Sequence, residues 1–120
     1  MIRIVVGGQL AKNEIASKID KIAGDKVSVK VTGDLDGAMS VKKGFADYYF
    51  GSCATGAGGS LALAIALLGM NKCLTVATPS KMASDAEMIN AVKNGVVAFG
   101  FVPDCLDHVL DVIIPQIING

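Results

Sequence analysis

The sequence predicts an α/β protein in which one doubly wound, parallel sheet of five strands is covered by helices on both faces. Five short apolar or β-branched runs alternate with stretches of helical spacing, an order typical of parallel sheets joined by helices. The chain has 120 residues, which suits one domain core and is too short for two. Hydrophobic residues make up 52%, an excess that must be buried either in a sheet covered on both faces or in a subunit interface. We therefore expect a single domain over residues 1–120, built as a Rossmann-like three-layer sandwich.

The five runs expected to form strands are short and rich in apolar or β-branched residues. They are Ile2–Val6, Val27–Val31, Asp47–Gly51, Leu74–Thr78 and Val96–Phe101. The second lies in KVSVKV (26–31), which alternates lysine or serine with valine, so we expect a half-exposed strand at an edge of the sheet. Right-handed crossovers leave two common strand orders, and this edge position favours the flavodoxin-like order 2-1-3-4-5.

Helical spacing and helix-end signals separate these runs. Residues 11–22 carry alanine and isoleucine on one face and charged residues elsewhere, which predicts an amphipathic first helix. Ser84 and Glu87 have the spacing of a capping box that opens the fourth helix. Pro115 is expected to kink the last helix or to end its regular part early. Four glycines follow helical stretches, where a left-handed C-cap is needed: Gly24, Gly44, Gly69 and Gly95.

The third helix has an unusual pattern. LALAIALL, Leu61–Leu68, has no polar face, although a helix covering one side of a sheet normally has one. We expect a second subunit to cover its outer face, giving a homo-oligomer (a dimer or larger) through this helix. An unusually thick core within one chain is the alternative.

Composition excludes several classes of function. Eleven basic residues balance eleven acidic ones, and there is a single arginine and no tryptophan, so we expect no nucleic-acid partner and no anionic membrane surface. The longest apolar run, Leu61–Met70, is too short to cross a bilayer, and the first residues do not fit a signal peptide. Cys53, Cys73 and Cys105 form no C-x-x-C pair. Together these features favour a reduced, cytoplasmic protein.

Two glycine-rich stretches predict a ligand site. GGQ (7–9) follows the first expected strand, and SCATGAGGS (52–60) follows the third. In the favoured order, the strand order reverses between these two strands, and ligands bind at such a point, beyond the carboxyl ends of the strands. Glycines let backbone N–H groups and helix N-termini approach an anion, so we expect the phosphate or carboxylate of a small metabolite to bind there.

The candidate ligand-binding residues share this edge of the sheet, and Lys81 after the fourth strand adds a positive charge. They are Gly7, Gly8, Gln9, Ser52, Cys53, Ala54, Thr55, Gly56, Gly58, Gly59, Ser60 and Lys81. In the alternative interpretation, these glycines only allow tight packing of a helix against a strand.

Cys53 is the candidate catalytic residue. It comes just before a predicted helix N-terminus, which stabilises a thiolate, so it is a candidate base or nucleophile; the alternative is a small buried hydrophobic side chain. GDLDG (33–37) is more typical of helix N-caps than of a metal site, and His108 is the only histidine. The chain also lacks a P-loop, a dinucleotide fingerprint and a Cys-x5-Arg phosphatase motif. We therefore expect no metal and no cofactor.

Three segments resemble the YhfU-like bacterial family of unknown function. They are RIVVGGQL (3–10), ADYYFGSCATGAGGSLALAIALLG (46–69) and AVKNGVVAFGF (91–101). The resemblance covers essentially the whole chain, and its most specific part is YFGSCATGAGG (49–59). It implies a cytosolic α/β protein connected with small-molecule metabolism.

Two better-understood families offer fold-level analogies. Cys53, Thr55 and Gly56 are similar to the cysteine loop of ribose-5-phosphate isomerase B enzymes, which implies a base and a phosphate-binding loop; the acidic and histidine residues of that family are replaced by Gly8 and Gln9. Sugar-phosphotransferase IIB components carry a phosphorylated cysteine in a similar loop. Three functions stay open: a protein that binds a small anionic metabolite, a sugar-phosphate isomerase-like enzyme with Cys53 as base, and a phosphocarrier with phosphorylated Cys53.

Overall fold

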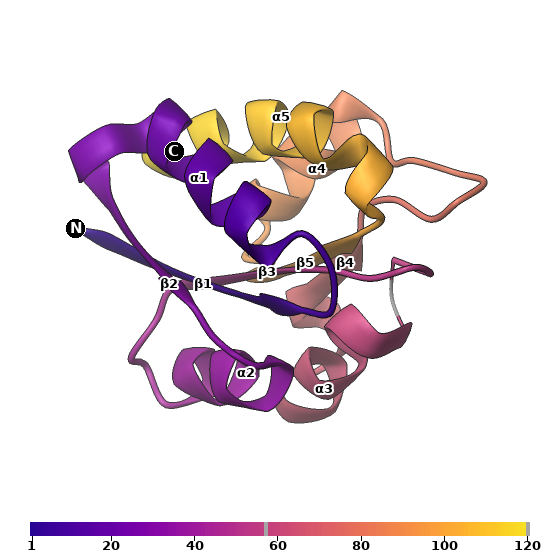
Figure 1. Cartoon of the computed structure of the whole chain (residues 1–120), viewed down its shortest axis with the longest axis horizontal. Helices are drawn as coiled ribbons and strands as arrows, with labels where there is room; N and C mark the ends of the chain where they lie inside the picture. Colours follow the sequence, from indigo (N-terminus) through magenta and orange to yellow (C-terminus); the bar gives the residue numbers. More distant parts are fainter. Residues whose placement is uncertain (57, 120) are drawn as a thin grey trace.

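Strands and helices alternate along the chain in a computed structural model that describes residues 1–56 and 58–119, with the backbone alone at residues 58–60 (Figure 1). The strands are β1 (Ile2–Gly8), β2 (Val27–Val31), β3 (Tyr48–Ser52), β4 (Cys73–Thr75) and β5 (Ala98–Phe101). The helices are α1 (Lys12–Ala23), α2 (Asp34–Lys42), α3 (Gly58–Leu68), α4 (Asp85–Lys93) and α5 (Leu106–Asn119). Every pairing between these strands is parallel, which confirms the predicted α/β class and its five-stranded sheet.

The order of the strands is β2-β1-β3-β5-β4, so the predicted order 2-1-3-4-5 is correct for the first three strands and wrong for the last two. All four residues of β5 are buried, and β5 lies between β3 and β4. The three residues of β4 are only half-buried and form the edge. A strand that is buried on both faces and paired on both sides takes the centre of a parallel sheet, and this preference decides the order.

The strand order also decides which helices share a face. The chain moves past β5 to reach β4 and then returns, and right-handed crossovers place helices on opposite faces for opposite directions of travel. Accordingly, α1, α4 and α5 cover one face, and α2 and α3 cover the other (Figure 1). The predicted order would have placed α4 beside α2 and α3.

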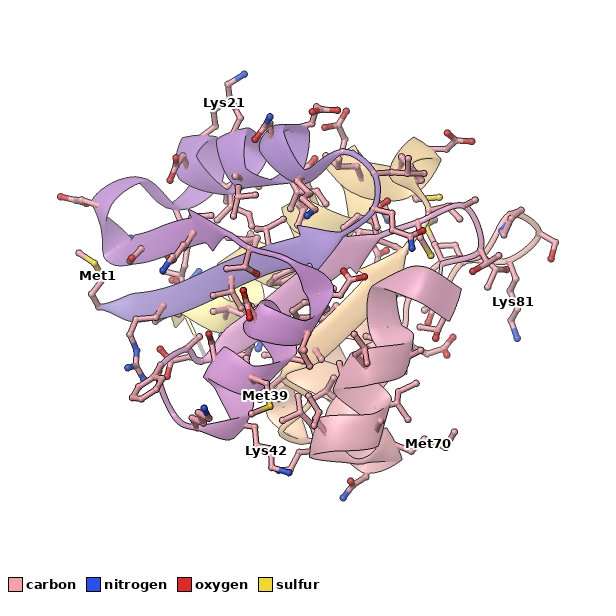
Figure 2. All side chains as sticks on the ribbon, turned by 60° about the horizontal axis from the view of Figure 1, so that its bottom comes forward. Met1, Lys21, Met39, Lys42, Met70 and Lys81 are labelled. Carbon is pink, nitrogen blue, oxygen red and sulfur yellow. The ribbon has the colours of Figure 1, made fainter. Side chains whose placement is uncertain are left out.

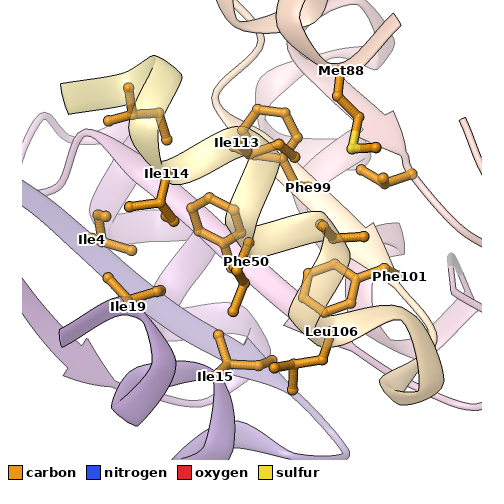
Figure 3. Close-up of a cluster of buried hydrophobic side chains, with 14 of the residues drawn as sticks. Ile4, Ile15, Ile19, Phe50, Met88, Phe99, Phe101, Leu106, Ile113 and Ile114 are labelled. Carbon is orange, nitrogen blue, oxygen red and sulfur yellow. The ribbon is translucent and has the colours of Figure 1, made fainter. Parts of the chain in front are cut away.

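Each face has its own hydrophobic core. The larger one lies between the sheet and α1, α4 and α5, where the rings of Phe50 and Phe99 stack with their centroids 5.1 Å apart, next to Ile113 and Ile114 (Figure 3). The smaller one, under α2 and α3, includes the buried Tyr49. Phe50 and Tyr49 follow one another in β3, so their side chains point to opposite faces of the sheet.

The expected helix ends are confirmed, with one correction at α5. The four glycines named above all have positive φ, although the ψ angles of Gly24 (−131°) and Gly69 (151°) lie outside the left-handed helical region. The side chain and backbone of Ser84 make both hydrogen bonds of a capping box with Glu87. However, α5 does not end at Pro115 but continues to Asn119. Proline removes one backbone hydrogen bond, and the buried apolar face of α5 offsets that loss.

The outer face of α3 is apolar and exposed. Ala62, Leu63 and Ala66 are exposed, while Leu61 and Ala64 face the core. Met39 of α2 and Met70, just after α3, lie on the same side of the molecule (Figure 2). Within the part of the chain that the structure describes, no helix has both the length and the apolar character needed to cross a membrane.

Candidate functional site

The carboxyl ends of β1 and β3 lie side by side and bring the two glycine-rich stretches together. Gly7 pairs with Gly51, and Gly8 with Ser52. After β1 the chain folds over β3, because the N–H groups of Gln9 and Leu10 both donate to the carbonyl of Ser52, at 2.9 and 3.1 Å. This approach requires glycine: a Cβ at Gly8, whose φ is +85°, would lie 2.5 Å from the Ser52 nitrogen. Residues 7–9 and 52–56 therefore form one contiguous edge of the sheet.

The loop after β3 packs tightly against the ends of the next strands. The N–H of Cys53 donates to the carbonyl of Phe101, at 3.2 Å. Gly56 has a φ of +85°, and a Cβ there would lie 2.1 Å from the carbonyl oxygen of Ala77. A Cβ at Gly100 would lie 2.5 Å from the carbonyl oxygen of Gly56. Glycine at position 56 thus serves close backbone packing, which is the alternative that the sequence left open.

Ser52 has a fully buried side chain whose hydroxyl lacks a hydrogen-bond partner among the described residues. By the alternation of β3, this hydroxyl points to the same face as Phe50, which is the face that α1 covers. An unpaired polar atom in a protein interior is uncommon and calls for a specific explanation.

The N-terminus of α1 follows directly from the loop that covers Ser52. Its N-cap residue, Ala11, is left-handed with a φ of 59° and provides no side-chain cap. The first N–H groups of an α-helix have no intrahelical acceptor, so those of α1 depend on water or on a ligand. The ammonium of Lys12 donates to the carbonyl of Thr32, at 2.9 Å, and adds a positive charge to this edge. An open helix N-terminus and a buried hydroxyl therefore lie where β1 and β3 end, and Lys12 holds a positive charge just after the neighbouring strand β2.

Asp34 belongs to the same edge, although the sequence did not indicate it as a site residue. Its Oδ1 accepts hydrogen bonds from the N–H of Gly8 and from the hydroxyl of Tyr49, the latter at 3.3 Å. The expectation that GDLDG supplies a capping aspartate is wrong, because the N-cap of α2 is Gly33 and no side chain caps this helix. Since β2 pairs with β1, the start of α2 lies beside the end of β1, and Asp34 reaches across to it.

Tyr49 and Cys53 lie on the face of the sheet that α2 and α3 cover, and both are almost fully buried, with exposures of 1% and 2%. Burial, followed by the negative charge of Asp34, raises the pKa of Tyr49 well above its usual range. The phenol therefore remains a neutral donor. The sulfur of Cys53 is 3.5 Å from the hydroxyl oxygen of Thr55. A thiol, a phenol and a carboxylate thus gather close to one strand end.

The other candidate residues lie around this centre. Ala54 and Thr55 are exposed. Lys81 is exposed on the loop after β4 (Figure 2), and β5 separates β4 from β3, but Ala77 at the start of that loop touches Gly56. Gly58, Gly59 and Ser60 form the first turn of α3, and their side-chain environment lies outside the described part of the structure.

Comparison with known proteins identifies relatives but no activity. Residues 2–117 match the family model described as "Protein of unknown function DUF2620". The curated relatives include "Uncharacterized protein YhfU" from Escherichia coli (strain K12) and the protein of the same name from Shigella flexneri. Each is 39% identical over 119 residues, a match that covers 99% of this chain and 97% of the relative. No solved structure matches the chain.

Proposed function

We propose that this chain, which belongs to the DUF2620 family of proteins of unknown function, binds a small anionic metabolite through its phosphate or carboxylate group. The ligand would bind at the edge between β1 and β3, where the strand order reverses. The observation that carries the proposal is the buried, unpaired hydroxyl of Ser52 at this edge. An unbound hydrogen-bonding group of this kind is costly unless a ligand or an ordered water satisfies it.

The donors for such an anion would come from helix N-termini more than from the glycine loop after β1. Three of that loop's N–H groups are already engaged, because Gly8 donates to Asp34, and Gln9 and Leu10 donate to Ser52. The open first turn of α1 and the start of α3 would supply the N–H groups. Access to the Ser52 hydroxyl requires residues 9–11 to move outward. This movement would break the hydrogen bonds that Gln9 and Leu10 donate to the carbonyl of Ser52, while the side chain of Leu10, which is 42% exposed, would lose little apolar contact.

A sugar-phosphate isomerase-like activity is the second candidate, and the grouping of Cys53 with Asp34 and Tyr49 favours it. In that reaction a base removes a proton from a carbon next to a carbonyl, and the proton returns to the neighbouring carbon through an enediolate. Cys53 would be the base, Asp34 would move the hydroxyl proton, and the neutral Tyr49 would donate to the developing charge. Both the isomerase and a phosphocarrier require a substrate or a partner to reach the sulfur of Cys53, which is 2% exposed.

Thermal unfolding in the presence of anions tests the proposal. The panel consists of inorganic phosphate, phosphorylated sugars and simple carboxylates, with chloride at equal ionic strength as control. An anion present at 100 times its dissociation constant stabilises the native state by about 2.7 kcal/mol, roughly 10 °C for a chain of this length. A flat panel would overturn the proposal.

A Cys53→Ser variant separates the three functions. Substitution of the sulfur should leave binding intact if the protein only binds the anion. It should abolish turnover but not binding if the protein is an isomerase. It should abolish covalent phosphorylation if the protein is a phosphocarrier. Mass spectrometry of the intact chain and a proton-exchange assay with the bound sugar phosphate provide the two further readouts.

A further inference from the structure

We infer that Asp34 makes the proposed site selective for anions that also carry a hydroxyl or ammonium group, which would bind to the second oxygen of its carboxylate. This inference rests on the proposed function and names the class of ligand: small phosphates or carboxylates with a hydrogen-bond donor close to the anionic group.

The two oxygens of Asp34 have different surroundings. Both hydrogen bonds that hold the side chain, from the Gly8 N–H and the Tyr49 hydroxyl, go to Oδ1. Oδ2 receives neither a hydrogen bond nor an ion pair from any residue that the structure describes, and the side chain is only half-buried. A carboxylate has about four acceptor positions in all, so Oδ2 can accept hydrogen bonds from a bound molecule.

The carboxylate is also fixed in position. Asp34 is the first residue of α2, and its two donors come from β1 and β3. Because Tyr49 is buried and stays neutral, its hydroxyl continues to donate over the whole physiological pH range. The free oxygen is therefore an acceptor held in place beside the edge where the anion would bind.

The charges of Asp34 and Lys12 determine which anions would bind more tightly at this edge. The negative charge of Asp34 repels a ligand that carries only a phosphate or carboxylate. The ammonium of Lys12, held on the carbonyl of Thr32 close to the start of α2, attracts the anionic end of a ligand. A ligand with a hydroxyl or ammonium group beside its anionic group turns the repulsion into a charge-assisted hydrogen bond. Fixed groups of both signs thus match a ligand that is anionic at one end and a donor at the other.

Two probes with the same anionic group test this inference. Glycerol 3-phosphate carries two hydroxyls, whereas propyl phosphate has none, and inorganic phosphate reports on the anion site alone. Calorimetric titration of the wild-type chain should show tighter binding of glycerol 3-phosphate than of propyl phosphate by about tenfold, the factor expected of one charge-assisted hydrogen bond.

Two variants assign the preference to Asp34. Asp34→Asn keeps an acceptor for Gly8 and Tyr49 but removes the charge, so the preference should fall to within about twofold, while inorganic phosphate binds as tightly as before or tighter. Asp36→Asn makes the same change of net charge at an exposed position on the same helix and should keep the tenfold preference. Thermal melts of each variant verify folding.

The outcomes of these titrations show whether the inference alone fails or whether the proposed function fails with it. If inorganic phosphate binds the wild-type chain but the two esters bind equally, the inference is wrong and the proposed function stands. The wild-type comparison decides this even if Asp34→Asn does not fold. If Asp34→Asn keeps the full preference, the donor binds elsewhere and the inference is wrong. If no probe binds, both are wrong.

Discussion

Substitution of Ser52 by alanine should raise the stability of the ligand-free protein. The hydroxyl of Ser52 is fully buried and has no partner among the described residues, so it carries a desolvation cost of about 1–3 kcal/mol in the folded state. Alanine removes the oxygen and is smaller than serine, so it requires no rearrangement of the core. The expected gain is therefore at least about 1 kcal/mol.

The expected stabilisation by Ser52→Ala is large enough to measure by thermal unfolding. The entropy of unfolding is about 2.1 cal/mol/K per residue, so for 120 residues each kcal/mol moves the midpoint by roughly 4 °C. Calorimetric melts in a phosphate-free buffer should place Ser52→Ala about 4 °C or more above the wild-type chain. Ser28→Ala, on the exposed surface of β2, is the matched control and should change the midpoint by less than about 2 °C.

Phosphate should raise the unfolding midpoint of the wild-type chain more than that of Ser52→Ala. If the hydroxyl donates to a bound anion, Ser52→Ala should lose a large part of the upward shift that phosphate produces in the wild-type chain. A midpoint for Ser52→Ala several degrees below that of the wild type would show instead that the hydroxyl has a stabilising partner. If phosphate raises the midpoint of Ser52→Ala by as much as that of the wild-type chain, the hydroxyl does not donate to the bound anion.

Three further predictions concern packing, assembly and pH. Gly56→Ala should destabilise the chain by at least about 2 kcal/mol more than Gly44→Ala in chemical denaturation, since both positions have similar positive φ but only a Cβ at Gly56 meets a backbone oxygen; equal losses would show that the contact is unimportant. Leu63→Lys should reduce the oligomer expected through α3 to a monomer in sedimentation experiments, whereas Met82→Lys, at nearly equal exposure, should not; a monomeric wild-type chain would contradict this expectation. The guanidinium of Arg3, which donates to Asp47, lowers the pKa of that carboxylate below its unfolded value, so the unfolded state binds more protons as the pH falls below about 4. The contribution of this pair is present above that pH and is lost as the pH falls through the folded pKa, and Asp47→Asn should flatten this part of the acid unfolding profile.

Local patterns in the sequence were enough to predict the class of fold and the first half of the sheet. The alternation in KVSVKV indicated an edge strand, and β2 is that edge. No comparable signal separates β4 from β5, because both are short apolar runs without a polar face. The order of β4 and β5 depends on which strand the helices cover on both faces of the sheet. That is decided only when the helices pack in the folded chain.

The sequence also indicated which loops meet at this edge of the sheet but not all of the side chains that lie there. Residues 7–9 and 52–56 meet as expected, because the carboxyl ends of neighbouring parallel strands share one edge. The hydrogen bonds of Asp34 to Gly8 and Tyr49 span 26 and 15 positions, so no local motif contains them. The predicted position of the second strand beside the first did place GDLDG at this edge, and that was the signal available for Asp34.

An anion site between β1 and β3 can be detected residue by residue from the backbone amide resonances of the protein during a titration with inorganic phosphate. We expect the largest and saturable shifts on residues 12–14, 52–56 and 58–60, where the N-terminus of α1, the cysteine loop and the start of α3 lie. The absence of shifts there would contradict this expectation. So would shifts confined to the groove at the opposite edge of the sheet, which is lined by Val41, Leu67 and Lys72.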